Sequence, residues 1–295
     1  MQNLSIIIAT YNSEAIIYSC LESLNFEKYE VFIVDNASKD KTLEIATKNF
    51  PQVKIIKNDK NIGYGRANNK VLKQIDKDFA LLLNADARIT EENIEKIINF
   101  LEKNPNFALA GPVIYNCKII DGKISDEKIC TKPNKKDKLS QNRNYLENQF
   151  ITGAGMFLNM KIMRKVGFFD EGFFLYCEDN EICKRVLKNG YKTAILKDTK
   201  LLHVGGNSSQ ISDLERARIY WHRLGWSKLY YTQKIHNSAI ARLKAVRMIL
   251  KYSIICLKEL IKNQKASIHN IKALQGCLAY FIGIKAFDKN DNARG

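Results

Sequence analysis

Residues 4–12 read LSIIIATYN, a short apolar run that stops at residues able to form hydrogen bonds. An unbroken apolar run of this length is typical of a strand buried on both faces of a sheet. No basic residue precedes it, so the segment predicts a first strand and not a secretion signal. The sequence therefore predicts a buried first strand that ends at Thr10-Tyr11-Asn12.

The pattern of strand followed by helix repeats four times in the first half of the chain. Further strands are predicted at residues 31–34, 53–56 and 80–83. Helical patterns follow, the last one capped by Thr90, at residues 14–25, 40–49, 67–75 and 93–101. This alternation predicts an α/β fold, a mostly parallel sheet flanked by helices. Ligands bind at the carboxyl ends of such strands, which here carry Asn12, Asp35, Asn61 and Asp86.

The composition is that of a basic globular protein. Its 295 residues are 45% hydrophobic and 26% charged, which excludes general disorder. Subtracting Asp+Glu from Lys+Arg gives 47 − 31 = +16, which favours anionic partners: phosphates, nucleic acid or a membrane surface. No stretch reaches about 18 apolar residues, so no membrane-spanning helix is expected. The cysteines are scattered without a C-x-x-C, which predicts reduced cytosolic thiols.

Three loops at the predicted strand ends suit a phosphate-bearing ligand, and each has a simpler alternative. Asp35, in VDNASKDKT, can bind a base or a ribose, or can form a turn and helix cap. Residues 61–69, NIGYGRANN, offer glycines and Arg66 to a diphosphate, or form a plain strand-to-helix turn. Asn68 replaces the third glycine of a dinucleotide fingerprint. Asp86, in LLLNADA, can hold Mg²⁺ or Mn²⁺, or can simply begin a loop.

Two motifs of the second half carry acid–base or metal chemistry. Residues 178–181, EDNE, follow an aromatic run, and burial beside apolar rings raises a carboxylate pKa toward general-base use. The alternative is an acidic helix N-terminus that complements the helix dipole. His203, in LLHVGGNSS, can complete a metal site or contact a phosphate, or can be structural.

Taken together, these motifs resemble family 2 of the inverting nucleotide-sugar glycosyltransferases, whose catalytic domain has the GT-A fold. The likeness covers roughly residues 3–210, with the motifs in the family's order, and is strongest to the rhamnosyltransferase-like branch that builds bacterial surface polysaccharides. Two departures stand out. Asn84 occupies the first position of the family's D-x-D motif, and the Q-x-x-R-W motif of processive members is missing, which favours transfer of a single sugar.

The resemblance implies a role for each motif. It places the nucleotide-sugar beside Thr10, Tyr11, Asn12, Asp35, Gly63, Arg66, Asn68, Asn84, Ala85 and Asp86. It makes Asp86 a ligand of Mg²⁺ or Mn²⁺, with His203 as a second ligand. It makes Asp179 the base that deprotonates the acceptor hydroxyl, with Glu178 beside it. The implied donor is dTDP-rhamnose or a UDP-hexose, and the acceptor a glycan or lipid-linked saccharide.

The remaining segments predict a two-part chain. We expect a catalytic domain over 1–211, with a donor half (1–110) and an acceptor half (111–211), and a helical region over 212–295. Within the acceptor half, residues 116–149 carry many lysines and few apolar residues, which predicts a mobile loop near the acceptor mouth or a solvated excursion.

The helical region carries sixteen Lys/Arg and five Asp/Glu, a net 16 − 5 = +11. Helices are predicted at 214–231, 239–261 and 268–287. We expect residues 239–287 to lie on the anionic inner face of the cytoplasmic membrane. The alternative is that they pack on the catalytic domain or on a second subunit in a homodimer.

Other functions fit the sequence less well. A nucleic-acid-binding protein is supported only by charge and by aromatic residues near Arg223, without a recognised motif. A nucleotidyltransferase would carry a Gly-rich basic loop after the first strand, where this chain has Thr10 to Glu14. A catalytically inactive donor-binding homologue is compatible with the Asn84 departure. We therefore predict a metal-dependent, cytoplasmic glycosyltransferase.

Overall fold

The computed structural model describes residues 3–120, 123–130, 144–147, 150–204, 213–261, 267–288, 290 and 292–294. The chain divides into two compact units. The first, here the α/β unit, consists of residues 1–59, 67–168 and 182–210. The second, here the helical unit, consists of residues 60–66, 169–181 and 211–295. Two short segments that the sequence assigned to the catalytic domain thus group with the C-terminal helices.

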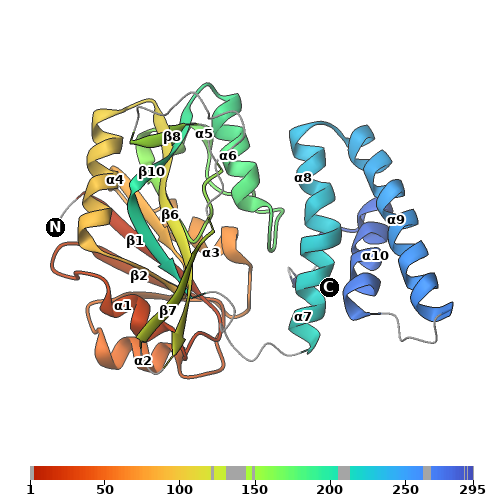
Figure 1. Ribbon diagram of the computed structural model, residues 1–295, viewed down its shortest axis with the longest axis horizontal. Helices are drawn as coiled ribbons and strands as arrows, with labels where there is room; N and C mark the ends of the chain where they lie inside the picture. Colours follow the sequence, from red (N-terminus) through yellow and green to blue (C-terminus); the bar gives the residue numbers. More distant parts are fainter. Residues whose placement is uncertain are drawn as a thin grey trace. The chain divides into compact units, whose positions relative to one another are not determined.

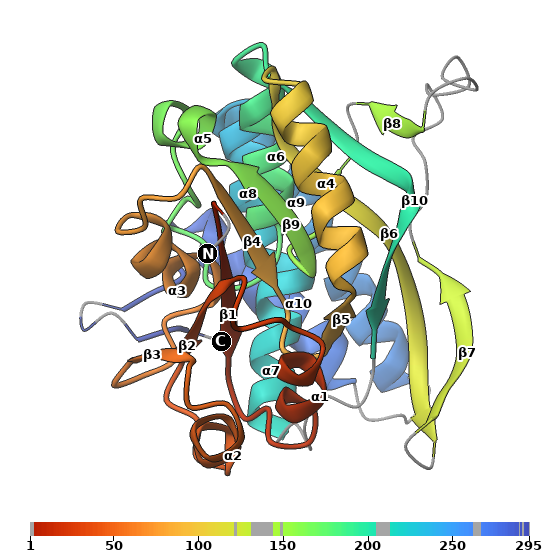
Figure 2. The ribbon, with the colours of Figure 1, turned by 90° about the vertical axis from the view of Figure 1, so that its left-hand side faces the viewer.

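A mixed sheet in the order β3-β2-β1-β4-β9-β6-β10-β5 forms the α/β unit, with β7 beside β6 and β8 beside β10 (Figure 2). The strands are β1 (Leu4–Thr10), β2 (Glu30–Asp35), β3 (Lys54–Lys57), β4 (Phe79–Leu83), β5 (Ala87–Ile89), β6 (Phe107–Ile120), β7 (Lys123–Ile129), β8 (Tyr145–Glu147), β9 (Gly155–Asn159) and β10 (Lys192–His203). The four predicted strands, β1 to β4, pair in parallel. Strands β1 and β4 are apolar because both of their faces are covered, whereas β3, at the end of the strand order, exposes Lys54 and Lys57.

The direction of the strands brings several loops to one edge of the sheet. Strand β9 is antiparallel to both β4 and β6, and β10 is parallel to β6, so β10 runs in the same direction as β4. The carboxyl ends of β1, β2, β4 and β10 therefore share one edge. Asp35, Asn84 and His203 stand at or just beyond these ends.

Helices cover both faces of this sheet. The helices are α1 (Ile17–Glu22), α2 (Thr42–Asn49), α3 (Tyr64–Leu72), α4 (Glu91–Lys103), α5 (Met160–Val166) and α6 (Glu178–Lys188). One core joins α1, α2 and α4 to the even-numbered residues of β1. Figure 1 shows α3 and α5 on the opposite face. The predicted cap of α4 is confirmed, because Thr90 Oγ1 accepts a hydrogen bond from the Asn93 amide.

Two predictions in this unit were wrong in extent. The helix expected at 14–25 is only the six residues of α1, since the chain leaves the helix at Ser23. The loop expected at 116–149 begins as strand: β6 runs to Ile120 and pairs with β7 in an antiparallel ladder. This hairpin is held by backbone hydrogen bonds and needs few apolar side chains, so its polar composition concealed it. Residues 131–143 of the expected loop lie outside the described residues.

The helical unit contains α7 (Asp213–Tyr220), a π-helical segment η2 (Trp221–Trp226), α8 (Ser227–Ile235), α9 (Ser238–Ile261) and α10 (Ile268–Phe281). The chain is helical throughout the range expected at 214–231, but its central segment η2 is π-helical, and there Gly225 lies against Gly276 of α10 too closely for any side chain. The helix expected to reach residue 287 ends at Phe281, because Gly283 adopts a left-handed backbone with φ +82°. No helix in the described ranges has both the length and the apolar content needed to cross a bilayer.

Candidate active site

A network of side chains fixes the loops after β1 and β2. Asp35 is buried, and its Oδ1 accepts hydrogen bonds from Thr10 Oγ1 at 3.0 Å and from Ser38 Oγ at 2.5 Å. The amide of Ser38 donates to Asp35 Oδ2 at 2.9 Å. Asp35 therefore forms the turn that the simpler interpretation predicted, and the turn holds its carboxylate at the carboxyl edge of the sheet.

Asn12 ties the same two loops together through a left-handed backbone. Its φ is +48°, a conformation that asparagine adopts more readily than most residues. Its amide donates to Ser38 Oγ at 2.9 Å, and its Oδ1 accepts from the Lys39 amide at 2.9 Å. Tyr11, beside it, is half-buried. Thr10, Asn12 and Asp35 are thus brought into one network, and their common role at the nucleotide stays a prediction.

Asp86 and His203 are brought together by strand pairing. The end of β10 pairs antiparallel with β5, with His203 opposite Ala87, and the Val204 amide donates to the Asp86 carbonyl at 2.8 Å. His203 Nε2 lies 3.2 Å from Asp86 Oδ1, and both side chains are mostly buried. On its other side, His203 Nδ1 lies 3.2 Å from Asn116 Oδ1.

The negative charge of Asp86 favours a positive charge, either a proton or a metal ion, between Asp86 and His203. Burial lowers the pKa of His203, but the hydrogen bond and the charge of Asp86 outweigh burial, and the pKa lies above its ordinary value. Without a metal, the proton on Nε2 points at Asp86 Oδ1; loss of that proton, with Nδ1–H donating to Asn116 Oδ1, would free the Nε2 lone pair for a metal. A carboxylate oxygen and an imidazole nitrogen facing each other form a suitable ligand pair for Mn²⁺.

The ligand set is small. Within the described ranges, no group of three or more His, Cys, Asp or Glu side chains is arranged to hold a metal ion. This agrees with the way Mg²⁺ is bound at phosphoryl sites, where one or two protein ligands are completed by substrate phosphates and water. The pair therefore fits a metal that arrives with a diphosphate.

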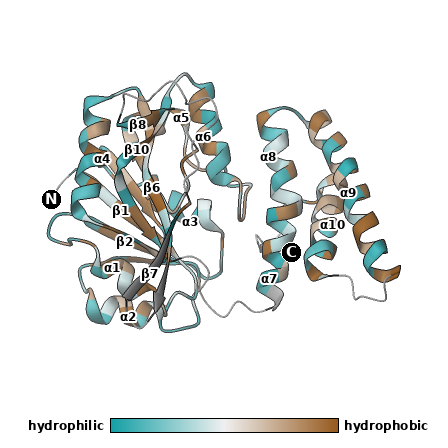
Figure 3. Ribbon diagram, in the orientation of Figure 1, coloured by the Kyte–Doolittle hydropathy of each residue, from teal (hydrophilic) through white to brown (hydrophobic). Residues whose placement is uncertain are grey.

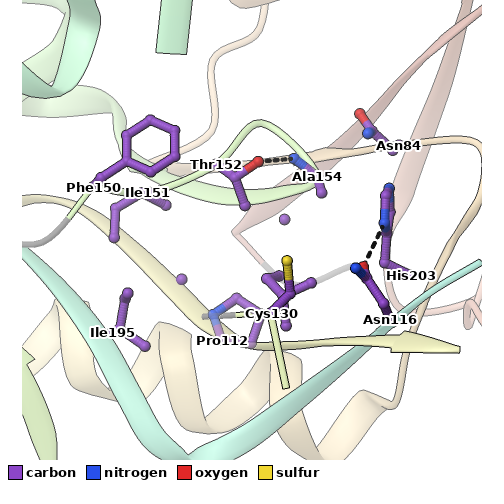
Figure 4. A pocket seen from close by; sticks show the side chains of 13 residues that line it. Asn84, Pro112, Asn116, Cys130, Phe150, Ile151, Thr152, Ala154, Ile195 and His203 are labelled. Carbon is purple, nitrogen blue, oxygen red and sulfur yellow. Dashed lines mark hydrogen bonds between the residues drawn. The ribbon is translucent and has the colours of Figure 1, made fainter. Parts of the chain in front are cut away.

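A cavity of about 480 Å³ opens beside the pair. Figure 4 shows Asn84, Asn116 and His203 at one end, and Phe150, Ile151 and Ile195 at the other. Two glycines shape its floor: a Cβ on Gly111 would lie 2.9 Å from Ile151 Cγ2, and one on Gly155 would lie 2.4 Å from Leu201 Cδ1. The cavity thus combines a polar end beside the candidate metal ligands with an apolar end.

The predicted donor loop is held within the helical unit. Gly63 has φ +88°, and a Cβ there would lie 2.3 Å from the Phe174 carbonyl oxygen, so only glycine fits. Arg66 Nε donates to the Glu171 carbonyl at 2.8 Å, and its guanidinium stacks 3.6 Å above the Phe287 ring. Arg66 therefore contacts residues of the helical unit, to which it belongs. Its diphosphate contact stays a prediction.

The acidic motif begins α6. Glu178, Asp179 and Glu181 stand in the first turn of this helix, as the dipole interpretation predicted. Two residues just before it, Tyr176 and Cys177, have positive φ angles of 66° and 72° without being glycine. Such consecutive strained residues are uncommon and gather at functional sites.

Glu178 is the most perturbed carboxyl group in this turn. It is buried, and within the described part of the chain its Oε2 has no hydrogen-bond partner. Burial, followed by the nearby charge of Asp179, raises the pKa of Glu178 to about 8. Glu178 therefore holds its proton more readily than an ordinary glutamate, and the role of Asp179 as the base stays a prediction.

The remaining predicted site residues occupy less informative positions. Asn84 lines the cavity, Ala85 is buried beside it, and Asn68 is fully buried in α3. Sequence analysis missed Asn116, since it fell in the range expected to be a loop. The available signal was its place directly after the run Val113, Ile114 and Tyr115.

The comparisons with known proteins agree with this geometry. The sequence model of Glycosyl transferase family 2 matches residues 5–167, more than half of the chain. The chain therefore belongs to glycosyl transferase family 2, as its motifs predicted.

Relatives and solved structures extend this assignment. An uncharacterized glycosyltransferase of Haemophilus influenzae is 35% identical over 106 residues, which span 35% of this chain and only 36% of that protein. An N-acetylglucosaminyl-diphospho-decaprenol L-rhamnosyltransferase of Mycobacterium tuberculosis is 20% identical over 239 residues, 70% of this chain and 77% of that protein. A crystal structure of GalNAc-T7 with UDP, GalNAc and Mn²⁺ matches with a TM-score of 0.60 at 13% identity, covering 95% of this chain and 58% of that one. The predicted GT-A fold is thereby confirmed.

Proposed function

We propose that this protein is an inverting glycosyltransferase that moves one sugar from a nucleotide-diphosphate sugar to a hydroxyl group of an acceptor. One observation carries the proposal. In a chain of glycosyl transferase family 2, Asp86 and His203 face each other at 3.2 Å, at the edge of the sheet where ligands of α/β proteins bind.

Each predicted residue has a defined task in this reaction. Thr10, Asn12 and Asp35 orient the nucleoside through the loops that they lock together. Asp179 accepts the proton of the acceptor hydroxyl as its oxygen attacks the anomeric carbon, and this direct displacement inverts the centre. Asp86 and His203 would hold Mg²⁺ or Mn²⁺, which when bound supplies positive charge opposite the leaving diphosphate.

The donor and acceptor follow from chemistry and from similarity. The relative from Mycobacterium tuberculosis is named a rhamnosyltransferase that acts on a lipid-diphosphate sugar. We extend this to dTDP-rhamnose or a UDP-hexose as the donor, and to a glycan or lipid-linked saccharide as the acceptor. We place this sugar transfer in bacterial surface polysaccharide synthesis, at the inner face of the cytoplasmic membrane.

The test is calorimetric titration of the full chain with UDP, dTDP, GDP and CDP, each with Mn²⁺ and again with EDTA. We expect one nucleotide to bind, and to bind only with the metal. The Asp86→Asn variant should lose this binding, whereas Asp198→Asn, which alters an exposed carboxylate, should keep it. Failure of the folded protein to bind any nucleotide contradicts the proposal. Donor binding without sugar transfer to any acceptor would indicate an inactive homologue.

A further inference from the structure

Helix α9 presents apolar residues on two opposite sides. One side packs within the helical unit through Ala241, Ala245 and Tyr252. The other side is open to solvent, and its apolar residues recur every three or four positions, so they form one continuous stripe. The stripe consists of Leu243, Val246, Leu250, Ile254, Leu257 and Ile261. A helix that only had to complete the bundle would be polar on its outer side.

The side chains of the stripe are not half-covered by neighbouring residues but largely open to solvent. Leu250 is 58% exposed, Ile254 52% and Leu257 57%. Helix α10 carries a similar outer row, Ile268, Ile271 and Leu278, followed by Ile282 just past its end, and all four are exposed. Figure 3 shows apolar colouring along both helices. Contiguous exposed apolar surface of this kind marks an interaction surface.

A row of cations accompanies the stripe on α9. Arg247 and Lys258 each follow a stripe residue by four positions, and Lys251 follows Arg247 by four, so the three lie side by side along it. All three are exposed. The only acidic residue of α9 and α10 is Glu259, and its carboxylate is occupied by the Ser267 amide and by Asn270 Nδ2. The surface therefore offers apolar side chains and uncompensated positive charge together.

The positive charge beside the stripe decides between two candidate partners for this surface, a second copy of the chain and an anionic bilayer. A second copy of this chain would bring the same row of cations against the first, and these two helices have no free carboxylate to pair with them. An anionic bilayer satisfies both features at once, since its acyl region receives the stripe and its headgroups receive Arg247, Lys251 and Lys258.

We infer that the outer faces of α9 and α10 form a docking surface for an anionic lipid bilayer, with α9 lying along the membrane plane. The inference deepens the proposed function, on which it rests for its purpose: an enzyme whose acceptor is lipid-linked meets that acceptor at the bilayer. The contact itself needs neither donor nor acceptor.

The test is cosedimentation of the full chain with phosphatidylcholine vesicles that contain or lack phosphatidylglycerol. Three triple variants accompany the wild type. The first reverses the row of cations (Arg247→Glu, Lys251→Glu, Lys258→Glu). The second makes the stripe polar (Leu250→Ser, Ile254→Ser, Leu257→Ser). The third is a control with the same change in net charge at exposed lysines of the α/β unit (Lys48→Glu, Lys161→Glu, Lys184→Glu).

We expect wild type and control to bind only the vesicles with phosphatidylglycerol, and to release them as salt is raised. Each cation near the surface strengthens binding about fivefold, so the reversed row should weaken it roughly a hundredfold or more. The polar stripe should weaken it comparably, with helix content unchanged by circular dichroism.

Three outcomes overturn the inference: no binding by the wild type, equal loss in the control, or a wild-type dimer in sedimentation velocity that the polar stripe dissociates. Nucleotide titration of the same samples keeps the two proposals apart. Vesicle binding without nucleotide binding contradicts the proposed function alone, and nucleotide binding without vesicle binding contradicts the docking surface alone.

Discussion

His203 lies directly opposite Asn116 in the pairing of β10 with β6, and its Nδ1 stands 3.2 Å from Asn116 Oδ1. This contact orients the ring so that Nε2 faces Asp86. Asn116 is therefore a positioning residue for a metal ligand and not a ligand itself.

Removing this contact should weaken metal binding without removing a ligand. We expect Asn116→Ala to lower Mn²⁺ affinity in the presence of the bound nucleotide by about 10-fold to 100-fold. Asn116→Asp, which keeps an acceptor at the same place, should retain most of it. Calorimetric titration of Mn²⁺ measures the change. Equal affinities in Asn116→Ala and wild type would contradict the positioning role.

Asp179→Asn should abolish sugar transfer and spare donor binding. The amide cannot accept the acceptor proton, and loss of a general base costs between about a hundredfold and ten-thousandfold in rate. The measurement is turnover with the donor identified by titration, alongside nucleotide affinity. Asp198→Asn, at an exposed carboxylate of β10, is the matched control. Near-normal turnover of Asp179→Asn would remove this residue from the mechanism.

The buried Glu178 predicts a pH dependence of stability. Burial and the charge of Asp179 raise its pKa from 4.5 to about 8, so between these values the folded protein binds more protons than the unfolded chain. The free energy of unfolding therefore falls as pH rises through this window, by at most about 1.4 kcal/mol for each pH unit.

Glu178→Gln removes this loss, because the amide cannot ionise. The Tm of the variant minus that of wild type should increase from about pH 5 to about pH 8 and level off above that. Thermal unfolding followed by circular dichroism across this range provides the measurement. A Tm difference that does not change with pH would show that Glu178 ionises normally.

Much of the donor half could be predicted because its signals are local. Strands β1, β2 and β4 are short runs rich in apolar residues, Asp35 ends β2, and Asp86 lies three residues beyond β4. The pairing of Asp86 with His203 could not be predicted from local patterns, since it depends on an antiparallel contact between β5 and the end of β10. The resemblance to the family proposed it, and the strand register explains it.

The errors also have physical causes. Hairpin β6–β7 is polar because backbone bonds hold it, so composition indicated a loop. The π-helical segment η2 within the helix expected at 214–231 coincides with a tertiary contact, where Gly225 meets Gly276. The periodicity of residues 214–231 alone does not reveal that Gly225 packs against α10. Gly283 was the one local signal that was overlooked, and it stops α10 near Phe281.

Comparing Gly63 with Gly190 distinguishes the cost of a left-handed backbone from the cost of a steric clash. Gly63 and Gly190 both have positive φ angles, +88° and +81°, but a Cβ on Gly190 meets nothing within 4 Å, whereas one on Gly63 lies 2.3 Å from the Phe174 carbonyl oxygen. Gly190→Ala should therefore cost only the left-handed backbone, about 1–2 kcal/mol. Gly63→Ala should cost that amount plus a displacement of Phe174 or of the 61–66 loop.

Urea unfolding of both variants measures the two free energies, and nucleotide titration adds a functional readout. Because residues 61–66 are the proposed donor loop, Gly63→Ala should also weaken nucleotide binding, whereas Gly190→Ala should leave it unchanged. If the two variants lose equal stability and both bind nucleotide normally, then Phe174 does not restrict this loop, and glycine is needed at Gly63 for its φ angle alone.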